Sequence, residues 1–174
     1  LAEDALPAAA LAFEKGEPGL LHEPPRPRRS TILGRPHQRL VLSISGVTTA
    51  LFFGLFLFLK NIGYGIEYAR TIMFVGLSMS SLLYLYSCRS LRHTVWQSNP
   101  FSNHAVNFSV LFGALLLAAA VYVPGLQRVL DTVPLGTRDW LLIAAVSILN
   151  LLLVEILKRI FVLERTKRIR LSAP

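Results

Sequence analysis

Two adjacent carboxylates followed by a proline are the residues of this chain whose types and spacing could do chemistry. Glu3, Asp4 and Pro7 lie together in the apolar stretch LAEDALPAAALAF. A carboxylate is costly inside an apolar membrane helix, and a proline removes a backbone donor and frees carbonyl oxygens. Because hard cations prefer carboxylate and carbonyl oxygens, we predict a cation site at this pair of carboxylates, Asp4 and Glu3. These residues alone leave open that the stretch is a helix end in water.

The rest of the chain contains no motif of a soluble catalytic site. It has no P-loop, no GxSxG, no HExxH and no glycine-rich nucleotide motif. A single cysteine, Cys88, cannot form an internal disulfide. We therefore expect no catalytic residue and no cofactor-binding residue. Histidine ligation of a metal is not expected either, because the four histidines fall in predicted loops without ligand spacing: His22, His37, His93 and His104.

The composition indicates the surroundings in which these carboxylates must act. Of the 174 residues, 53% are hydrophobic and 16% are charged, and the mean hydropathy is +0.51. A soluble domain carries roughly 25% charged residues, so this chain has too few polar side chains to cover a soluble fold. It is also too apolar for a disordered chain. The net charge of +8 would suit a nucleic-acid binder only if the basic residues shared one folded face without membrane spans, so no nucleic-acid partner is expected.

Four uncharged runs mark predicted membrane spans. A bilayer core needs about 20 apolar residues in a helix, and the runs are 40–59, 71–88, 105–127 and 140–154. The first three are long enough by themselves, and the fourth is long enough if Glu155 lies near one interface or is shielded by other helices. We predict an all-α fold, a polytopic membrane helix bundle with four full transmembrane helices and a partial N-terminal helix at 1–13. The four full helices are expected at about 40–60, 69–88, 105–124 and 139–161. No signal peptide is visible, and a start at Leu1 within an apolar stretch suggests a fragment of a longer protein.

Two basic segments flank the four-helix region, which is expected to cover 40–162. Residues 14–39 form a Pro/Arg-rich loop that proline keeps extended, and residues 163–174 form a basic tail. Fourteen Lys and Arg lie in the loop, in the connection after the second span and towards the C-terminus, against four on the other side. The positive-inside rule places loop and C-terminus in the cytoplasm. The loop is either a solvated connector or a docking strip for another domain or for acidic lipid headgroups.

Small and amide side chains within the spans predict how the helices pack. Gly46, Ala50 and Gly54 recur every four residues in the first full span. Small residues on one face let another helix approach closely, so these three predict a packing seam. Asn150 in the last span predicts a hydrogen bond to a neighbouring helix, because an amide in hydrocarbon needs a protein partner.

Two acidic residues of the last span have expected electrostatic roles. Glu155 lies in an apolar helix, three and four residues before Lys158 and Arg159. This spacing favours an ion pair near the cytoplasmic end of the helix, and an ion-related role is the alternative. At the other end, Thr137 or Asp139 can cap the helix, where a negative charge meets the positive end of the helix dipole.

Several stretches of the chain resemble the C-terminal transport region of P-type cation-transporting ATPases, in the branch of the calcium pumps. EDALPAAALAFEKGEPGLLHEPPRPRRSTIL resembles their sixth transmembrane helix and the following cytoplasmic loop. The later matching stretches, in order, are ARTIMFVGLSMSSLLYLYSCRS, NPFSN and VYVPGLQRVLDTVPLGTRDWLLIAAVSILNLLLVEILKRI. The resemblance runs from about Leu1 to Phe161, and its order and spacing are highly specific. It implies that the four full spans are the seventh to tenth helices.

The resemblance also implies roles for individual residues. Asp4 occupies the position of an aspartate that is a cation ligand on the sixth helix of the family. Glu3 stands where calcium pumps often have threonine, which leaves the identity of the ion open. Ser80 stands where calcium pumps of the muscle type have a glutamate ligand on the eighth helix, so one of their two calcium sites lacks this ligand here.

A parent pump would couple ATP hydrolysis to cation movement. The phosphorylated DKTG aspartate and the nucleotide and actuator domains are absent from this chain, so Mg-ATP would bind to the parent alone. The expected partners are the lipid bilayer and the remaining helices and cytoplasmic domains of the pump. The resemblance implies that loop 14–39 couples the membrane helices to the phosphorylation domain. The alternative is a stand-alone small membrane scaffold or subunit without ATPase activity. An upstream reading frame that encodes DKTG would decide for the pump.

Overall fold

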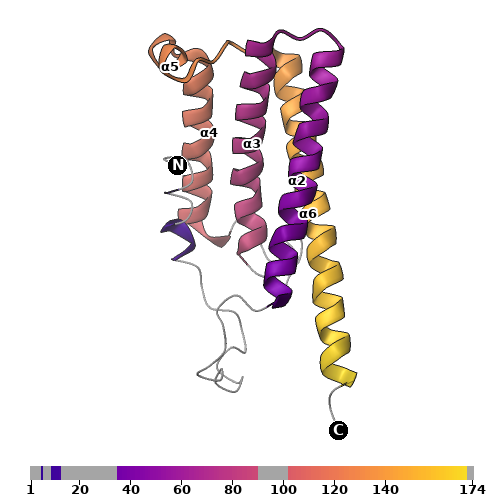
Figure 1. Cartoon of the computed structure of the whole chain (residues 1–174). Coiled ribbons are helices and arrows are strands. Elements are labelled where there is room, and N and C mark those ends of the chain that lie inside the picture. Colours follow the sequence, from indigo (N-terminus) through magenta and orange to yellow (C-terminus); the bar gives the residue numbers. More distant parts are fainter. Residues whose placement is uncertain (1–4, 6–8, 13–34, 90–101, 172–174) are drawn as a thin grey trace.

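The computed structural model describes residues 5, 9–12, 35–89 and 102–171, and it describes the side chains of these residues except 35–37 and 161–171. These residues are helical apart from short connections, and no strand occurs among them. The helices, shown in Figure 1, are α2 (Arg35–Asn61), α3 (Ile66–Cys88), α4 (His104–Tyr122), α5 (Pro124–Leu130) and α6 (Thr137–Leu171).

Four of these helices are long and apolar enough to cross a membrane. The spans contain between 19 and 24 residues, close to the length that a bilayer core requires. They are Gln38–Asn61, Ile66–Cys88, His104–Tyr122 and Thr137–Ile160. The predicted all-α class and the four full spans are therefore confirmed.

Successive spans run in opposite directions, which gives the bundle two distinct ends. The α2–α3 turn and α5 lie together at the end that we call the loop end (Figure 1). The start of α2, the end of α3 and the end of α6 lie at the other, which we call the tail end. Arg35 and Leu171 therefore lie towards the same end, as an even number of spans requires.

Helix bounds differ from expectation at three places. The first span begins at Arg35, so Pro36 lies in the first turn of a helix, where its missing N–H is not needed, and not in the extended loop. The last helix runs to Leu171, ten residues beyond the expected end at 161, because no proline or glycine interrupts it. Between the spans expected at 105–124 and 139–161, Pro124 starts the short helix α5.

The core lies around α3, which contacts α2, α4 and α6. Its most extensive contact is with α6, whereas α2 is the least covered of the four spans. Burial of apolar side chains against one another fills the interior as in any close-packed fold. The largest side chains that are almost fully buried are Phe52, Leu59, Ile72, Leu82 and Ile143.

Close helix approach uses two glycines that the sequence pattern did not single out. An added Cβ at Gly76 would come within 2.9 Å of the Phe52 ring, and one at Gly113 within 2.7 Å of Leu82. The expected seam differs, because Gly46 and Gly54 have no atom within 4 Å of an added Cβ. No helix in the described part of the chain packs against that face.

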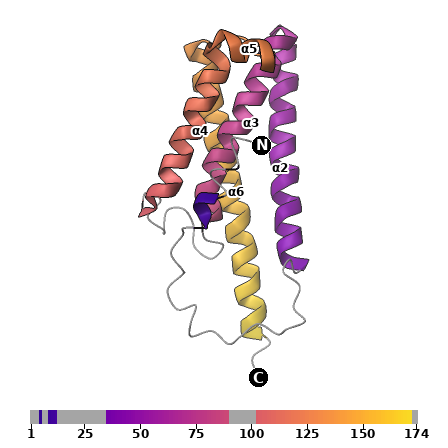
Figure 2. The same cartoon turned by 90° about the vertical axis from the view of Figure 1, so that its left-hand side faces the viewer.

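Residues 9–12 attach the first segment of the chain to the bundle. Ala10 is buried against Leu85 of α3 and Val106 of α4, with Leu11 and Tyr86 beside them. Figure 2 shows this short helical turn, in indigo, towards the tail end of the bundle. The segment that contains the predicted cation ligands therefore ends in contact with α3 and α4.

Candidate functional site

The predicted cation ligands Asp4 and Glu3 lie outside the described residues. What the structure does place is the end of their segment, where Ala10 packs on Leu85 and Val106. Within the described part of the chain, no group of three His, Cys, Asp or Glu side chains is arranged to hold a metal ion. The described residues therefore include no such group, and the site at Asp4 and Glu3 stays a prediction.

A buried charged cluster joins α3 to α6 at the tail end. Ser87 Oγ donates to Glu155 Oε1 at 2.5 Å, and Lys158 Nζ donates to the Ser87 carbonyl oxygen at 2.8 Å. Lys158 Nζ lies 3.5 Å from Glu155 Oε1, and both side chains are about 5% exposed. The predicted ion pair with Lys158 is confirmed, whereas Arg159 is exposed. Because Lys158 matches the carboxylate charge, the ion pair fits Glu155 better than an ion-binding role.

The last turn of α3 explains why this cluster forms. The carbonyl groups at the end of a helix lack intrahelical donors and carry a partial negative charge. Lys158 supplies a donor and a positive charge to one of them, at Ser87. Sequence reasoning found the pair within α6 from its spacing, but it could not find Ser87, which lies 68 residues before Glu155.

Halfway along the bundle, a neutral polar group connects α2 to α6. Thr48 Oγ1 donates to Asn150 Oδ1 at 2.9 Å, which confirms the interhelical hydrogen bond predicted for Asn150. Ser80 of α3 is also buried here, and all three side chains line a pocket of 340 Å³. The position that the resemblance aligned with a glutamate ligand is thus a serine in a neutral environment.

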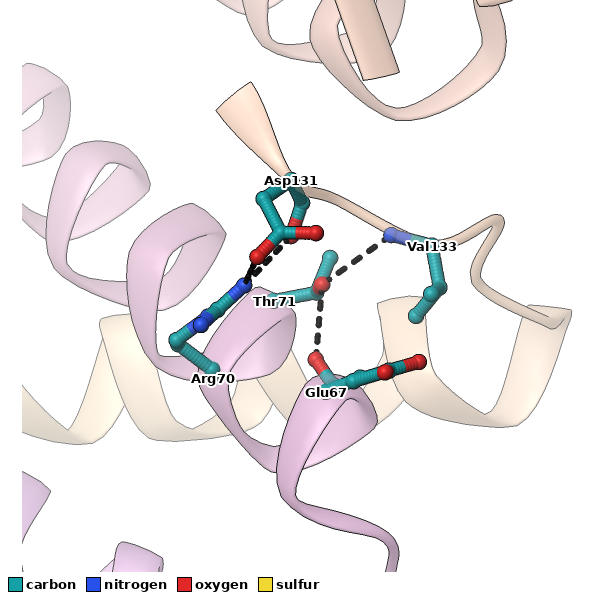
Figure 3. A network of polar contacts seen from close by, with 5 residues as sticks. All are labelled: Glu67, Arg70, Thr71, Asp131 and Val133. Atoms are coloured by element: carbon teal, nitrogen blue, oxygen red, sulfur yellow. Dashed lines mark hydrogen bonds and ion pairs between the residues drawn. The ribbon is translucent and has the colours of Figure 1, made fainter. Parts of the chain in front are cut away.

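At the loop end, a third polar network fastens the connection between α5 and α6 to α3 (Figure 3). The Arg70 guanidinium pairs with the Asp131 carboxylate and donates to the Asp131 carbonyl oxygen at 3.0 Å. Thr71 Oγ1 donates to the Glu67 carbonyl at 2.9 Å and accepts from Val133 N–H at 3.1 Å. Sequence reasoning missed this network because Arg70 and Asp131 are 61 residues apart.

Of the two residues predicted to cap the start of α6, Thr137 and Asp139, it is Asp139 that forms the hydrogen bond. Asp139 Oδ2 accepts from the Gly136 N–H at 2.8 Å, which places a carboxylate at the positive end of the helix dipole. Tyr64 donates to Asp139 Oδ1 at 3.3 Å, and the negative charge of Asp139 raises the pKa of Tyr64. Beside it, Trp140 donates to the Tyr122 hydroxyl at 2.8 Å. These hydrogen bonds join the start of α6 to the α2–α3 turn and to the end of α4.

Comparison with known proteins gives the family. The model of the family "Cation transporting ATPase, C-terminus" matches residues 1–160. A calcium-transporting ATPase of Bacillus subtilis is 32% identical over 150 residues, which cover 84% of this chain and 16% of that protein. The human calcium-transporting ATPase type 2C member 2 is 31% identical over 159 residues, covering 89% of this chain and 16% of that protein.

A third relative, calcium-transporting ATPase 1 of Bacillus cereus, is 28% identical over 173 residues, with 91% of this chain and 20% of that protein covered. The chain therefore spans a fifth or less of the length of these relatives. The family match ends at residue 160, where the last of the four spans ends. The chain belongs to the family of cation-transporting ATPases, as part of their C-terminal membrane region.

Proposed function

We propose that this chain is the C-terminal membrane region of an ATP-driven cation pump. It would provide the end of the sixth helix and helices seven to ten of that pump. The observation that carries the proposal is the family match over residues 1–160, which coincides with four membrane-capable helices. ATP would be bound and hydrolysed in other domains of the parent. The chain would supply part of the cation site, the helix scaffold and the coupling loop 14–39. No observation favours a stand-alone scaffold.

The proposed cation ligand is Asp4, with Glu3 as a weaker second one. Both precede Pro7 in an apolar segment, and carboxylate and freed carbonyl oxygens suit a hard cation. The charge of Glu155 is already matched by Lys158, so this buried carboxylate is not available to compensate a transported ion. Packing of Ala10 on Leu85 and Val106 supports the proposal because it attaches the segment to the helix scaffold.

Calcium is the first ion to test, because the bacterial and human relatives are named calcium-transporting ATPases. The experiment is ATP-dependent uptake by inside-out vesicles that contain the full-length parent, with Ca²⁺, Mn²⁺, Mg²⁺ and Na⁺ offered separately. The expected result is uptake of one divalent cation that stops without ATP. Absence of ATP-dependent uptake of every ion would contradict the pump and favour the scaffold.

The proposed orientation places loop 14–39 and the C-terminus in the cytoplasm, following the distribution of basic residues. The position of Arg35 and Leu171 towards one end of the bundle supports a common side for both. Single cysteines at Ser30 and Ser172, in a Cys88→Ser background, test it with an impermeant thiol reagent. Both should react from the cytoplasmic face, and reaction from opposite faces would contradict the topology.

A further inference from the structure

A polar pocket lies about halfway along the bundle, between α2, α3 and α6. Its volume is 340 Å³, and seven of its nine lining residues carry a hydroxyl or an amide group. Ser80 and Asn150 on its wall are each 4% exposed, whereas Ser45 and Ser81 are exposed. Thr48 and Asn150 already pair with each other. Hydrocarbon cannot pair with a polar group that has no protein partner, so any such group here favours an occupant that can form hydrogen bonds.

The Ser80 hydroxyl is the clearest indication of a missing partner. Among the buried side-chain oxygen and nitrogen atoms of the described residues, Ser80 Oγ is the one without a hydrogen-bond partner. Other buried serines of the bundle are satisfied, since Ser109 Oγ donates to the Val106 carbonyl at 2.8 Å and Ser87 Oγ to Glu155. A helical serine can bond back to a carbonyl one turn earlier. Ser80 does not form this bond, although the geometry of a helix offers it to any serine.

Charge and size decide which occupant fits. No charged residue lines the pocket, and the buried charges of Glu155 and Lys158 are matched to each other. A cation held here would lack compensation for its charge, so a neutral ligand that both donates and accepts fits better. A cavity needs about 10–15 Å³ of this kind of volume to hold one water, so the pocket has room for several.

We propose that this pocket is a hydrated cavity inside the membrane region, in which ordered water joins Ser80 to Asn150. Asn150 Oδ1 accepts from Thr48, and the same amide carries two N–H donors for water. A water molecule needs two to four polar partners, and the side chains of three helices supply them. The existence of this cavity does not depend on which cation the parent moves.

The first test is the sign of the change in thermal stability for Ser80→Ala in the full-length parent. If water satisfies the hydroxyl, alanine removes a hydrogen-bond partner and lowers the apparent melting temperature. If the hydroxyl is dry and unpaired, alanine removes an unsatisfied buried group and raises it. Ser109→Ala, which loses only a local bond to Val106, is the matched control for the general effect of serine to alanine. A raised melting temperature for Ser80→Ala would overturn the proposal.

The second test separates water from a protein or lipid occupant. Ser80→Cys, in a parent without other cysteines, is treated in native membranes with a small water-soluble methanethiosulfonate. Because the reagent attacks the thiolate, which forms only in a hydrated site, we expect reaction at least about ten-fold faster than at Leu115→Cys. Leu115 of α4 is 60% exposed on the surface of the bundle and serves as the lipid-facing control. Equal, slow reaction at both positions would show that lipid or another part of the parent fills the pocket.

Discussion

The two ends of the bundle contain ion pairs of opposite kinds. At the tail end, Lys158 and Glu155 pair with side chains that are 5% and 6% exposed. At the loop end, Arg70 and Asp131 pair with side chains that are 52% and 76% exposed. Each pair fastens α3 to another part of the chain, the first to α6 through Ser87 and the second to the connection after α5.

Burial decides what each pair contributes. Removing one partner of a buried pair leaves an uncompensated charge and typically costs about 3–5 kcal/mol, whereas an exposed pair contributes about 0–1 kcal/mol. The α3–α6 contact at the tail end is therefore stabilised by charges whose separation costs several kcal/mol of folding free energy. The loop end depends instead on several small contacts, such as those of Thr71 and Asp139.

The largest expected effect follows from breaking the buried pair. Lys158→Met should destabilise the bundle by about 3–5 kcal/mol, because Glu155 then stays buried without its counter-charge. The measurement is unfolding of the purified parent in mixed micelles by increasing SDS. The double variant Lys158→Met/Glu155→Leu removes both charges and should recover most of the loss. Equal damage in the single and double variants would mean that packing, and not charge, is what the pair contributes.

An intermediate loss of stability is expected at Gly113, where α4 approaches α3 closely. Gly113→Ala places a methyl group 2.7 Å from Leu82 and should cost about 1–3 kcal/mol by overpacking. Gly46→Ala is the matched control, because the Cβ meets open space and alanine favours a helix by about 1 kcal/mol. Thermal unfolding of both variants checks the difference. A loss at Gly46 as large as at Gly113 would show that another helix of the parent covers that face.

The smallest effect is expected at the exposed pair. Arg70→Ala should change stability by no more than about 1 kcal/mol, because water solvates both charges after the pair is broken. Raising the salt concentration should reduce even this difference, since exposed charges are screened. The same SDS titration measures it alongside Lys158→Met. A loss comparable to that of Lys158→Met would remove the contrast between the two ends.

Features that depend on local spacing could be predicted from the sequence. Three uncharged runs of sufficient length and a shorter fourth run that ends before Glu155 predicted the four helices, and the three-residue separation of Glu155 and Lys158 predicted their ion pair. An isolated amide in an apolar helix needs a hydrogen-bond partner, and Asn150 accepts a hydrogen bond from Thr48. In each case the pattern itself contains the physical constraint.

Features that depend on which helices meet could not be predicted in this way. The repeat of Gly46 and Gly54 shows that they share a face, but not what that face contacts, and the close approaches occur at Gly76 and Gly113 instead. The pairing of Arg70 with Asp131 needs the turn after α5, where Asp131 adopts a left-handed conformation with φ of 52°. For Asp4 and Glu3, outside the described residues, the site remains a prediction from residue types and resemblance.

The central claim is that Asp4 binds the cation that the parent pump moves. The most direct test is cation-dependent phosphorylation of the full-length parent by ATP, compared between wild type, Asp4→Asn and Glu3→Gln. Asparagine keeps the size of the side chain and removes the charge that a cation requires. The account predicts that Asp4→Asn needs far more cation for half-maximal phosphorylation, that Glu3→Gln is affected less, and that both variants remain folded in the membrane. An unchanged cation dependence in Asp4→Asn would contradict it.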